Sequence, residues 1–253
     1  MKKLWFLCFS ALILASCQSK ITFEPQHYQA QSKENCQPHE GCAKFNLDIV
    51  AATDKSTAAD SINNSVFKMI RRAMYVGEKP QEAKNYLELT NSFIQTHNQI
   101  KNEFLERFKV LPPSWEATGK CRLQWQSNRM FNMVLEYYTF TGGAHGYGAT
   151  LSEFYDAKTG QKIPNRQLFT DTLSVASLVE KQFRKQNKID SKTSLTEAGY
   201  FIPNDQFFLP KNIYLTKTAV VFHYNPYEIA AYAFGDIEVA VPRKEIEPLL
   251  KLK

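Results

Sequence analysis

The most informative stretch of the sequence is residues 130–155, MFNMVLEYYTFTGGAHGYGATLSEFY. Apolar and polar side chains alternate on both sides of a glycine-rich segment, residues 142–148, and this period of two is typical of half-buried strands. Strands joined by so short a turn pair antiparallel, so the stretch predicts a hairpin. Residues 121–126 are also strand-like, and a three-residue turn connects them to the hairpin. This predicts a third neighbouring strand.

Upstream of this hairpin the sequence predicts one strand and two helices. Residues 44–51 alternate as a strand, a helix begins near Asp60, and Pro80 suits the first turn of a second helix. The second helix carries an apolar stripe with steps of three and four residues. The stripe consists of Tyr86, Leu89, Phe93, His97, Ile100, Phe104 and Phe108.

Downstream, Asp171 is a candidate cap for a third helix. Its predicted apolar face consists of Leu173, Ala176, Val179 and Phe183. Strands are predicted over 213–215, 219–224 and 237–241, and a short helix over 243–250. Because strands and helices occur in blocks rather than in alternation, we expect an α+β fold with antiparallel sheets packed by helices in a single compact body.

The N-terminus predicts export and a membrane anchor. Lys2 and Lys3 precede an apolar run over residues 4–15 that is too short to span a bilayer. The run ends in Leu-Ala-Ser-Cys, which resembles a bacterial lipobox. That resemblance implies a signal peptide over 1–16, acylation of Cys17 and a lipidated tether over 17–42. The membrane is then a partner through the lipid. We expect an extracytoplasmic protein of the cell envelope, which in a Gram-negative host would sit on the outer membrane and face the periplasm.

After export, three cysteines remain beside the lipidated one, and an exported compartment permits disulfides. Cys36 and Cys42 enclose a five-residue turn, so this pair is the candidate disulfide. A bridge from Cys121 to either of them is the alternative. A metal site at Cys36, His39 and Cys42 lacks a fourth ligand, and we expect no metal and no cofactor.

The net charge of the chain is too small to indicate that it binds nucleic acid. The chain has 31 basic and 25 acidic residues, a net charge of +6. Loss of Lys2 and Lys3 with a signal peptide leaves +4 (29 basic against 25 acidic residues). This excess is small and spread along the sequence, so no nucleic-acid partner is predicted.

Two segments carry a family resemblance: YTFTGGAHG at 138–146 and FHYNPYEIAAYAFG at 222–235. They resemble the paired extracytoplasmic domains of RsiV-type anti-sigma factors, which sense lysozyme, and of PdaC-type polysaccharide deacetylases. The likeness covers residues 43–253 and implies a PdaC-like region over 43–148 and an RsiV-like region over 149–253. The cytoplasmic domain and spanning helix of an anti-sigma factor are not expected here, nor is the metal-binding domain of a deacetylase. The remaining implied activity is binding of a muramidase or of cell-wall glycan.

Gly142, Gly143 and His145 form the first candidate binding site. Consecutive glycines can gather backbone N–H groups into a concavity that holds an anion, and the imidazole can add a donor or a base. The alternative is a strand-to-strand turn in which the glycines supply positive φ angles and the histidine packs locally.

Tyr224, Tyr227, Glu228 and Tyr232 form the second candidate. Tyrosines beside a carboxylate suit a glycan groove, because sugars stack on aromatic faces and hydrogen-bond to acids. The alternative is a structural tyrosine cluster around a turn. A glycosidase would need a second carboxylate near Glu228, and Asp236 and Glu238 are near it in sequence.

These observations predict a lipid-anchored, non-catalytic envelope protein that recognises peptidoglycan-type glycan or a muramidase such as lysozyme. No His-Glu-x-x-His, Gly-x-Ser-x-Gly or phosphate-loop motif is present in the sequence. Two alternatives remain: an envelope hydrolase that uses His145 or Glu228, and a purely structural envelope lipoprotein.

Overall fold

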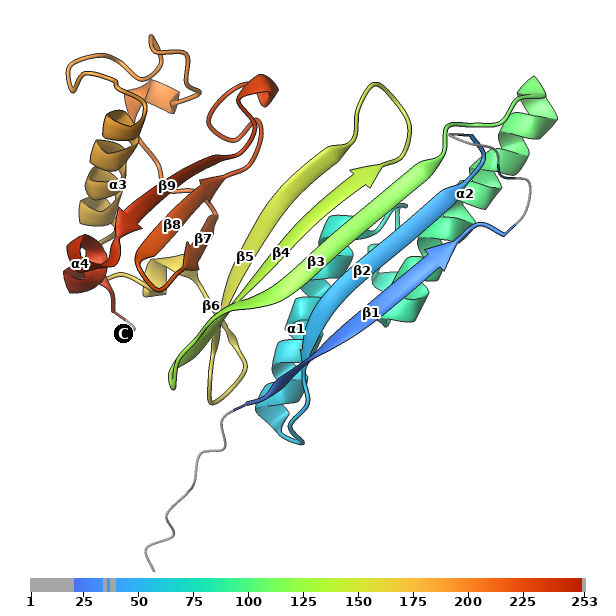
Figure 1. Ribbon diagram of the computed structural model, residues 1–253, viewed down its shortest axis with the longest axis horizontal. Helices are drawn as coiled ribbons and strands as arrows, with labels where there is room; N and C mark the ends of the chain where they lie inside the picture. Colours follow the sequence, from blue (N-terminus) through green and yellow to red (C-terminus); the bar gives the residue numbers. More distant parts are fainter. Residues whose placement is uncertain (1–20, 34–35, 37–39, 252–253) are drawn as a thin grey trace, which may run out of the picture.

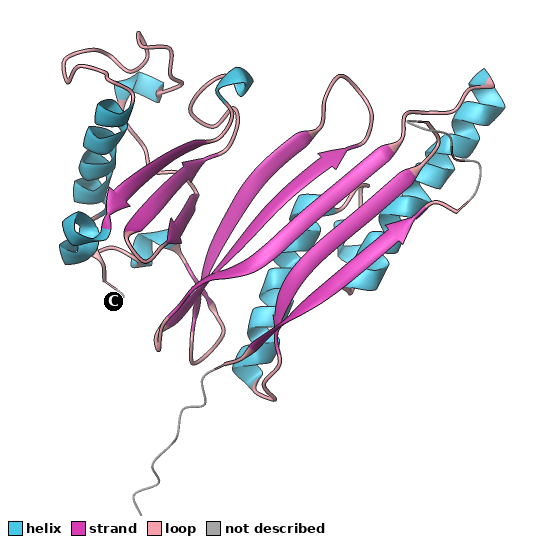
Figure 2. Cartoon of the chain, viewed as in Figure 1, coloured by secondary structure: helices cyan, strands magenta, loops and turns pink. Residues whose placement is uncertain are grey.

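The computed structural model describes residues 21–33, 36 and 40–251. Two sheets form its framework (Figures 1 and 2). A six-stranded sheet has the order β1-β2-β3-β4-β5-β6, and a three-stranded sheet has the order β7-β8-β9. The first sheet contains β1 (Phe23–Gln31), β2 (Ala43–Ala52), β3 (Trp115–Gln126), β4 (Met130–Phe140), β5 (Tyr147–Asp156) and β6 (Lys162–Ile163), and the second contains β7 (Asn212–Leu215), β8 (Ala219–Tyr224) and β9 (Ile237–Pro242).

Two α-helices of the described residues cover one face of the first sheet, and the other two lie beside the second sheet (Figure 2). The α-helices are α1 (Thr57–Met74), α2 (Tyr86–Phe108), α3 (Thr172–Gln186) and α4 (Arg243–Ile246). Short 3₁₀ turns cover Pro80–Glu82, Asn165–Gln167, Pro203–Asp205, Tyr232–Phe234 and Glu247–Leu249. The predicted α+β class is confirmed, and neighbouring strands pair antiparallel except for β2 and β3, which are parallel. The exception follows from connectivity, because α1 and α2 form the crossover between these two strands.

The first core lies between the six-stranded sheet and α1 and α2. Phe45, Leu47 and Ile49 of β2 alternate toward the helices and are buried. The stripe on α2 is confirmed in its first half, where Leu89, Phe93 and His97 are buried. Phe108, at the last turn of α2, is 62% exposed.

Two predicted helix starts are corrected. The side chain of Ser56 caps α1 by accepting from Ala59 N, so the helix begins before Asp60. Pro80 starts a separate 3₁₀ turn. The side chain of Asn85 caps α2 by accepting a hydrogen bond from Glu88 N. In both cases a Ser or Asn side chain supplies the acceptor that the first helical N–H groups need.

The second core lies between the three-stranded sheet and α3. Asp171 caps α3 as predicted, because its carboxylate accepts from the N–H groups of Leu173 and Ser174. The buried face of α3 consists of Val175, Val179 and Phe183, whereas Leu173 is 79% exposed. The predicted face was therefore wrong in its first turn.

Part of the predicted tether, residues 23–31, is an edge strand. All nine residues of β1 pair with β2, from Phe23 opposite Ala52 to Gln31 opposite Lys44. Phe23 packs edge-on against Phe131, with ring centroids 5.4 Å apart. The segment looked polar because an edge strand with one solvated face buries few side chains, and Pro25 is tolerated there because an edge strand leaves one row of backbone groups unpaired. The predicted signal peptide and Cys17 lie outside the described residues.

Cys121 lies too far from the other two cysteines to bridge either of them. It is buried on β3, six residues beyond Trp115, which pairs with Ala43. Six residues of strand span about 20 Å, whereas a disulfide needs Cα atoms within about 7 Å. Burial is the largest cause of the raised pKa of Cys36, and a hydrogen bond with the Cys42 thiol raises this pKa further. Cys36 and Cys42 are thiols in contact, and their oxidation to a disulfide stays a prediction.

Hydrogen bonds between side chains and backbone join the two sheets. β7 is an edge strand, and its free edge meets the face of the first sheet that is turned away from the helices. Asn132 Oδ1 accepts from Leu215 N at 3.1 Å, and Ser152 Oγ donates to Ile213 O at 2.6 Å. In return, Asn212 Oδ1 accepts from Ser152 N at 3.2 Å. The two sheets thereby satisfy each other's edge groups.

Candidate functional site

The β4–β5 loop is shaped by its glycines. Gly142 and Gly143 have φ angles of +100° and +93°, a conformation that favours glycine. A Cβ on Gly146 would clash with the ring of Tyr138, so the ring packs directly on that backbone. His145 projects from this loop, and its Nδ1 donates to the carbonyl oxygen of Gly146 at 2.9 Å. The glycines therefore act as turn residues that present His145 at the surface.

A strained tyrosine lies at the turn after β8. Glu228 N donates to Asn225 O at 3.0 Å across a turn that has Pro226 second and Tyr227 third. Tyr227 has φ +69°, the left-handed conformation that such a turn usually assigns to glycine. Its side chain is 55% exposed, so burial does not compensate for the strain. Strain at an exposed aromatic residue is a reason to consider a binding role.

Neighbouring groups hold this turn in place. The carboxylate of Glu228 accepts from Asn225 N at 3.0 Å and from Lys211 N at 3.4 Å. The side chain of Asn225 accepts from Thr150 N at 2.7 Å and donates to Thr150 O at 3.0 Å, which fastens the turn to β5. The strained backbone is thus fixed by both sheets.

Three rings from the two loops form a continuous stack, which we call the aromatic platform: Tyr227, Tyr232 and His145. The rings of Tyr227 and Tyr232 are 5.3 Å apart at an angle of 32°. The ring of Tyr232 stacks on that of His145 at 4.7 Å and 23°. Tyr232 is 37% exposed and His145 is exposed as well. The platform lies where the loops of the two sheets come together, at one end of both sheets (Figure 1).

Carboxylates border the platform. Burial raises the pKa of Tyr147, and the negative charges of Glu228 and Asp236 raise it further, so both acids lie near that phenol. Glu238 accepts a hydrogen bond from Tyr214 and contacts His223 Nδ1 at 3.0 Å. Burial alone would raise the pKa of Glu238, but these two hydrogen bonds outweigh it and hold the pKa below its usual value. Glu228 and Asp236 thus lie near Tyr147, two residues after His145, whereas Glu238 lies beside His223 on the second sheet.

The structure brings together three of the predicted binding residues, with Glu228 beside them. His145 stacks on Tyr232, which contacts Tyr227, whereas Gly142 and Gly143 shape the loop that carries His145. Tyr224 is fully buried, and its hydroxyl donates to Phe208 O at 2.7 Å, so it belongs to the core. Glu228 lies beside the platform and holds the turn through backbone N–H groups.

Sequence reasoning did not identify two exposed aromatic residues near these loops or the strain at Tyr227. Tyr147 is 42% exposed and Phe234 is 56% exposed. The Asn-Pro-Tyr-Glu sequence could have indicated the strain at Tyr227. A turn with proline in its second position commonly has glycine in its third, and Tyr227 stands at that position.

Within residues 21–33, 36 and 40–251, no group of three or more His, Cys, Asp or Glu side chains is placed to hold a metal ion. Over the same residues, no helix is both long and apolar enough to cross a membrane.

Comparisons with known proteins agree with the two-part organisation. Residues 38–147 match a family model described as deacetylase PdaC, and residues 167–244 match one described as a protein of unknown function, DUF3298. The chain thus pairs a PdaC-like region with a DUF3298 region, which confirms the predicted resemblance. A search of curated proteins gave no match.

Solved structures show the same fold over nearly the whole chain. A DUF3298 family member from Bacteroides fragilis is 21% identical, covers 92% of this chain and 95% of its own, and has a TM-score of 0.71. A DUF3298 family protein from Pseudomonas aeruginosa is 20% identical, covers 92% and 96%, and has a TM-score of 0.60.

Proposed function

From the pairing of a PdaC-like region with a DUF3298 region, we propose that this chain is a lipid-anchored, non-catalytic binding protein of the bacterial envelope that recognises cell-wall glycan. The observation that carries the proposal is Tyr227, which is exposed, held in a strained conformation and stacked in a row with Tyr232 and His145. Strain of this kind costs about 1–3 kcal/mol and persists only where the surrounding structure enforces it.

The platform has the chemistry that a sugar chain requires. The C–H faces of pyranose rings stack on flat aromatic surfaces, and the stack leaves the outer faces of its two end rings, Tyr227 and His145, for such contacts. Tyrosine adds a hydroxyl at the edge of its apolar ring, so Tyr227 offers both stacking and a hydrogen bond, and Tyr232 offers its hydroxyl. Glu228 and Asp236 lie at the border, where their oxygens can accept from sugar hydroxyls.

The envelope location rests on the sequence. The lipobox-like segment that ends at Cys17 supports export and acylation, and the three remaining cysteines are compatible with an oxidising compartment. Cell-wall glycan is the polymer that a protein anchored there would meet.

A second candidate partner is a cationic muramidase, favoured by the acidic residues near Tyr147 and in the turn after β8. The chain as a whole is basic, so a cationic partner requires a local acidic surface. Asp236 supplies acidic charge near Tyr147 and contacts the ring of His223, and Tyr227 is an exposed ring of the type that anchors protein interfaces.

The local geometry favours binding over hydrolysis. Both carboxylate oxygens of Glu228 accept from backbone N–H groups, which is a structural role. His145 Nδ1 is engaged by the adjacent carbonyl group. A hydrolase that used either residue would lose turnover of cell-wall substrate in His145→Ala or Glu228→Gln while keeping its fold, and the proposal expects no turnover from the wild type.

The test is isothermal titration of residues 18–253 with purified muropeptides and, separately, with a cationic lysozyme. We expect the double variant Tyr227→Ala/Tyr232→Ala to bind muropeptides about tenfold or more weakly. Phe108→Ala is the matched control, because it removes an exposed aromatic ring on α2, and it should bind as the wild type does.

Each result has a defined meaning. If only lysozyme binds, and the double variant loses that binding, the ligand of the platform is the muramidase and not the glycan. Binding of neither probe, or equal binding by the double variant and the control, would contradict the proposal.

A further inference from the structure

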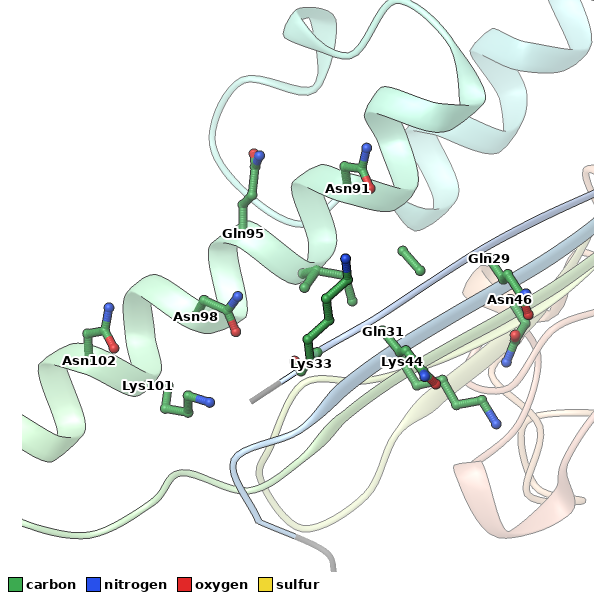
Figure 3. A pocket seen from close by; sticks show the side chains of 13 residues that line it. Gln29, Gln31, Lys33, Lys44, Asn46, Asn91, Gln95, Asn98, Lys101 and Asn102 are labelled. Carbon is green, nitrogen blue, oxygen red and sulfur yellow. The ribbon is translucent and has the colours of Figure 1, made fainter. Parts of the chain in front are cut away.

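A polar groove lies at the other edge of the first sheet, away from the aromatic platform. It has a volume of about 710 Å³ and runs between α2 and the ends of β1 and β2 (Figure 3). β1 is separated from β5, which leads out of the His145 loop, by three intervening strands. The groove is therefore independent of the proposed glycan platform, and we call it the carboxamide groove after the side chains that line it.

Helix α2 lines the groove with a row of carboxamides. Asn91, Gln95, Asn98 and Asn102 follow steps of four, three and four residues, which place them on one face of the helix. Figure 3 shows these four side chains along α2, with Asn98 directed toward Lys33 and the strands. Asparagine is a poor residue for a helix interior, because its short amide competes with the backbone for hydrogen bonds. Three asparagines on one helical face thus have no explanation in helix stability.

The strands supply matching carboxamides. Gln29 on β1 pairs with Asn46 on β2, and Gln31 pairs with Lys44. All four side chains line the groove. Because paired residues on neighbouring strands lie about 5 Å apart, these groups form a compact polar wall.

Among the described residues that line the groove, the charged ones are all lysines. Lys33, Lys44 and Lys101 line it, and none of its thirteen lining residues, all of them described, is acidic. Lys101 is 7% exposed and donates to Gly41 O at 3.2 Å, so one ammonium group is fixed at the wall. Among the described lining residues, Ala30 and Ile94 are the aliphatic ones and none is aromatic.

We propose that the carboxamide groove binds an acidic oligosaccharide. A carboxamide both donates and accepts hydrogen bonds, so a row of them matches the hydroxyl groups of a sugar chain. The lysines can pair with carboxylate groups on the same sugar chain. A protein partner is disfavoured, because the centre of a protein interface relies on apolar and aromatic anchors that the groove lacks.

The test is titration of residues 18–253 with hexagalacturonate, with maltohexaose as the neutral counterpart. We expect hexagalacturonate to bind and maltohexaose to bind at least about tenfold more weakly, with the difference decreasing as salt is added. The double variant Gln95→Ala/Asn102→Ala should bind hexagalacturonate about tenfold more weakly. Both residues are exposed and alanine favours helix, so the fold is kept.

Gln99→Ala is the matched control, because Gln99 is exposed on the same helix but does not line the groove. It should bind as the wild type does. Tyr227→Ala/Tyr232→Ala should also keep hexagalacturonate binding, so failure of the platform proposal leaves this one testable. The proposal is overturned if hexagalacturonate does not bind at about 1 mM, if maltohexaose binds equally well, or if Gln95→Ala/Asn102→Ala binds as Gln99→Ala does.

Discussion

Tyr227 combines an unfavourable backbone conformation with an exposed ring. Its φ of +69° is held by the hydrogen bond from Glu228 N to Asn225 O and by the attachment of Asn225 to β5. The ring gains a stacking contact with Tyr232, yet more than half of the side chain stays in solvent. A glycine would fit this turn without strain, so the tyrosine is best explained by what its ring does.

The strain can be measured by comparing two variants that both remove the ring. Tyr227→Gly should be more stable than Tyr227→Ala by about 1 kcal/mol, because only glycine adopts a positive φ without a steric penalty. At an ordinary position the order is the reverse, since glycine gives the unfolded chain more freedom. Urea denaturation of both variants gives the difference, and an alanine variant equal to or more stable than the glycine variant would refute the strain. Both variants should bind muropeptides equally weakly.

His97 should make stability depend on pH. Its ring is buried against Trp115, with centroids 5.4 Å apart, and burial lowers the pKa of His97 below the usual value near 6.5. Below pH 6.5 the unfolded chain therefore binds a proton that the folded chain resists, and the free energy of unfolding falls as the pH falls.

The measurement is urea denaturation at pH 7 and pH 5. Wild type should lose more stability between these values than His97→Leu does. His27 acts in the opposite direction, because its hydrogen bond to Asp48 raises its pKa, but it is present in both proteins and cancels in the comparison. Equal losses in the two proteins would show that the His97 imidazole does not resist protonation in the folded state.

At the level of the elements, the edge of β7 is held partly by one buried side chain of the first sheet, Asn132, beside Ser152. Asn132 is fully buried, accepts from Leu215 N, and donates to Ser152 Oγ at 2.9 Å and Glu153 O at 3.2 Å. Asn132→Leu keeps the branching at Cγ but leaves the N–H of Leu215 unpaired, so we expect a loss of about 2 kcal/mol in the free energy of unfolding. The amide of Leu215 should also exchange with solvent faster.

Asn64→Leu is the control, because Asn64 is exposed on α1 and its replacement should change stability by less than about 0.5 kcal/mol. An Asn132→Leu variant as stable as this control, with the exchange of the Leu215 amide unchanged, would show that the polar joint does not hold the sheets together.

The elements that could be predicted from the sequence are those with strong periodicity. The β4–β5 hairpin, the stripe at Leu89, Phe93 and His97, and the cap at Asp171 all express a local rule of burial or hydrogen bonding. β1 could not be predicted, because its polar side chains follow from its place at the edge of the sheet, which is set by pairing with β2. The parallel register of β2 and β3 is likewise a property of the assembled sheet.

The same distinction applies to the candidate site. The aromatic and glycine residues of the two loops were visible in the sequence, but the stacking of His145 on Tyr232 joins residues 87 positions apart and depends on how the sheets dock. Tyr224 was assigned to the site as a member of a tyrosine cluster with Tyr227 and Tyr232, yet its place on β8 turns its side chain into the core.

At the level of the whole molecule, the entry point of the chain determines what the protein can reach. Ile21 O accepts from Gln126 Nε2, so the chain enters beside the β3–β4 turn, at the end of the sheet opposite His145. Only five residues separate Cys17 from Phe23, a span of about 20 Å when fully extended. A fatty acid on Cys17 would therefore keep the body close to the lipid headgroups. The eleven residues of β4, about 35 Å of strand, would act as a rigid spacer that holds the tyrosines at a set height above the bilayer.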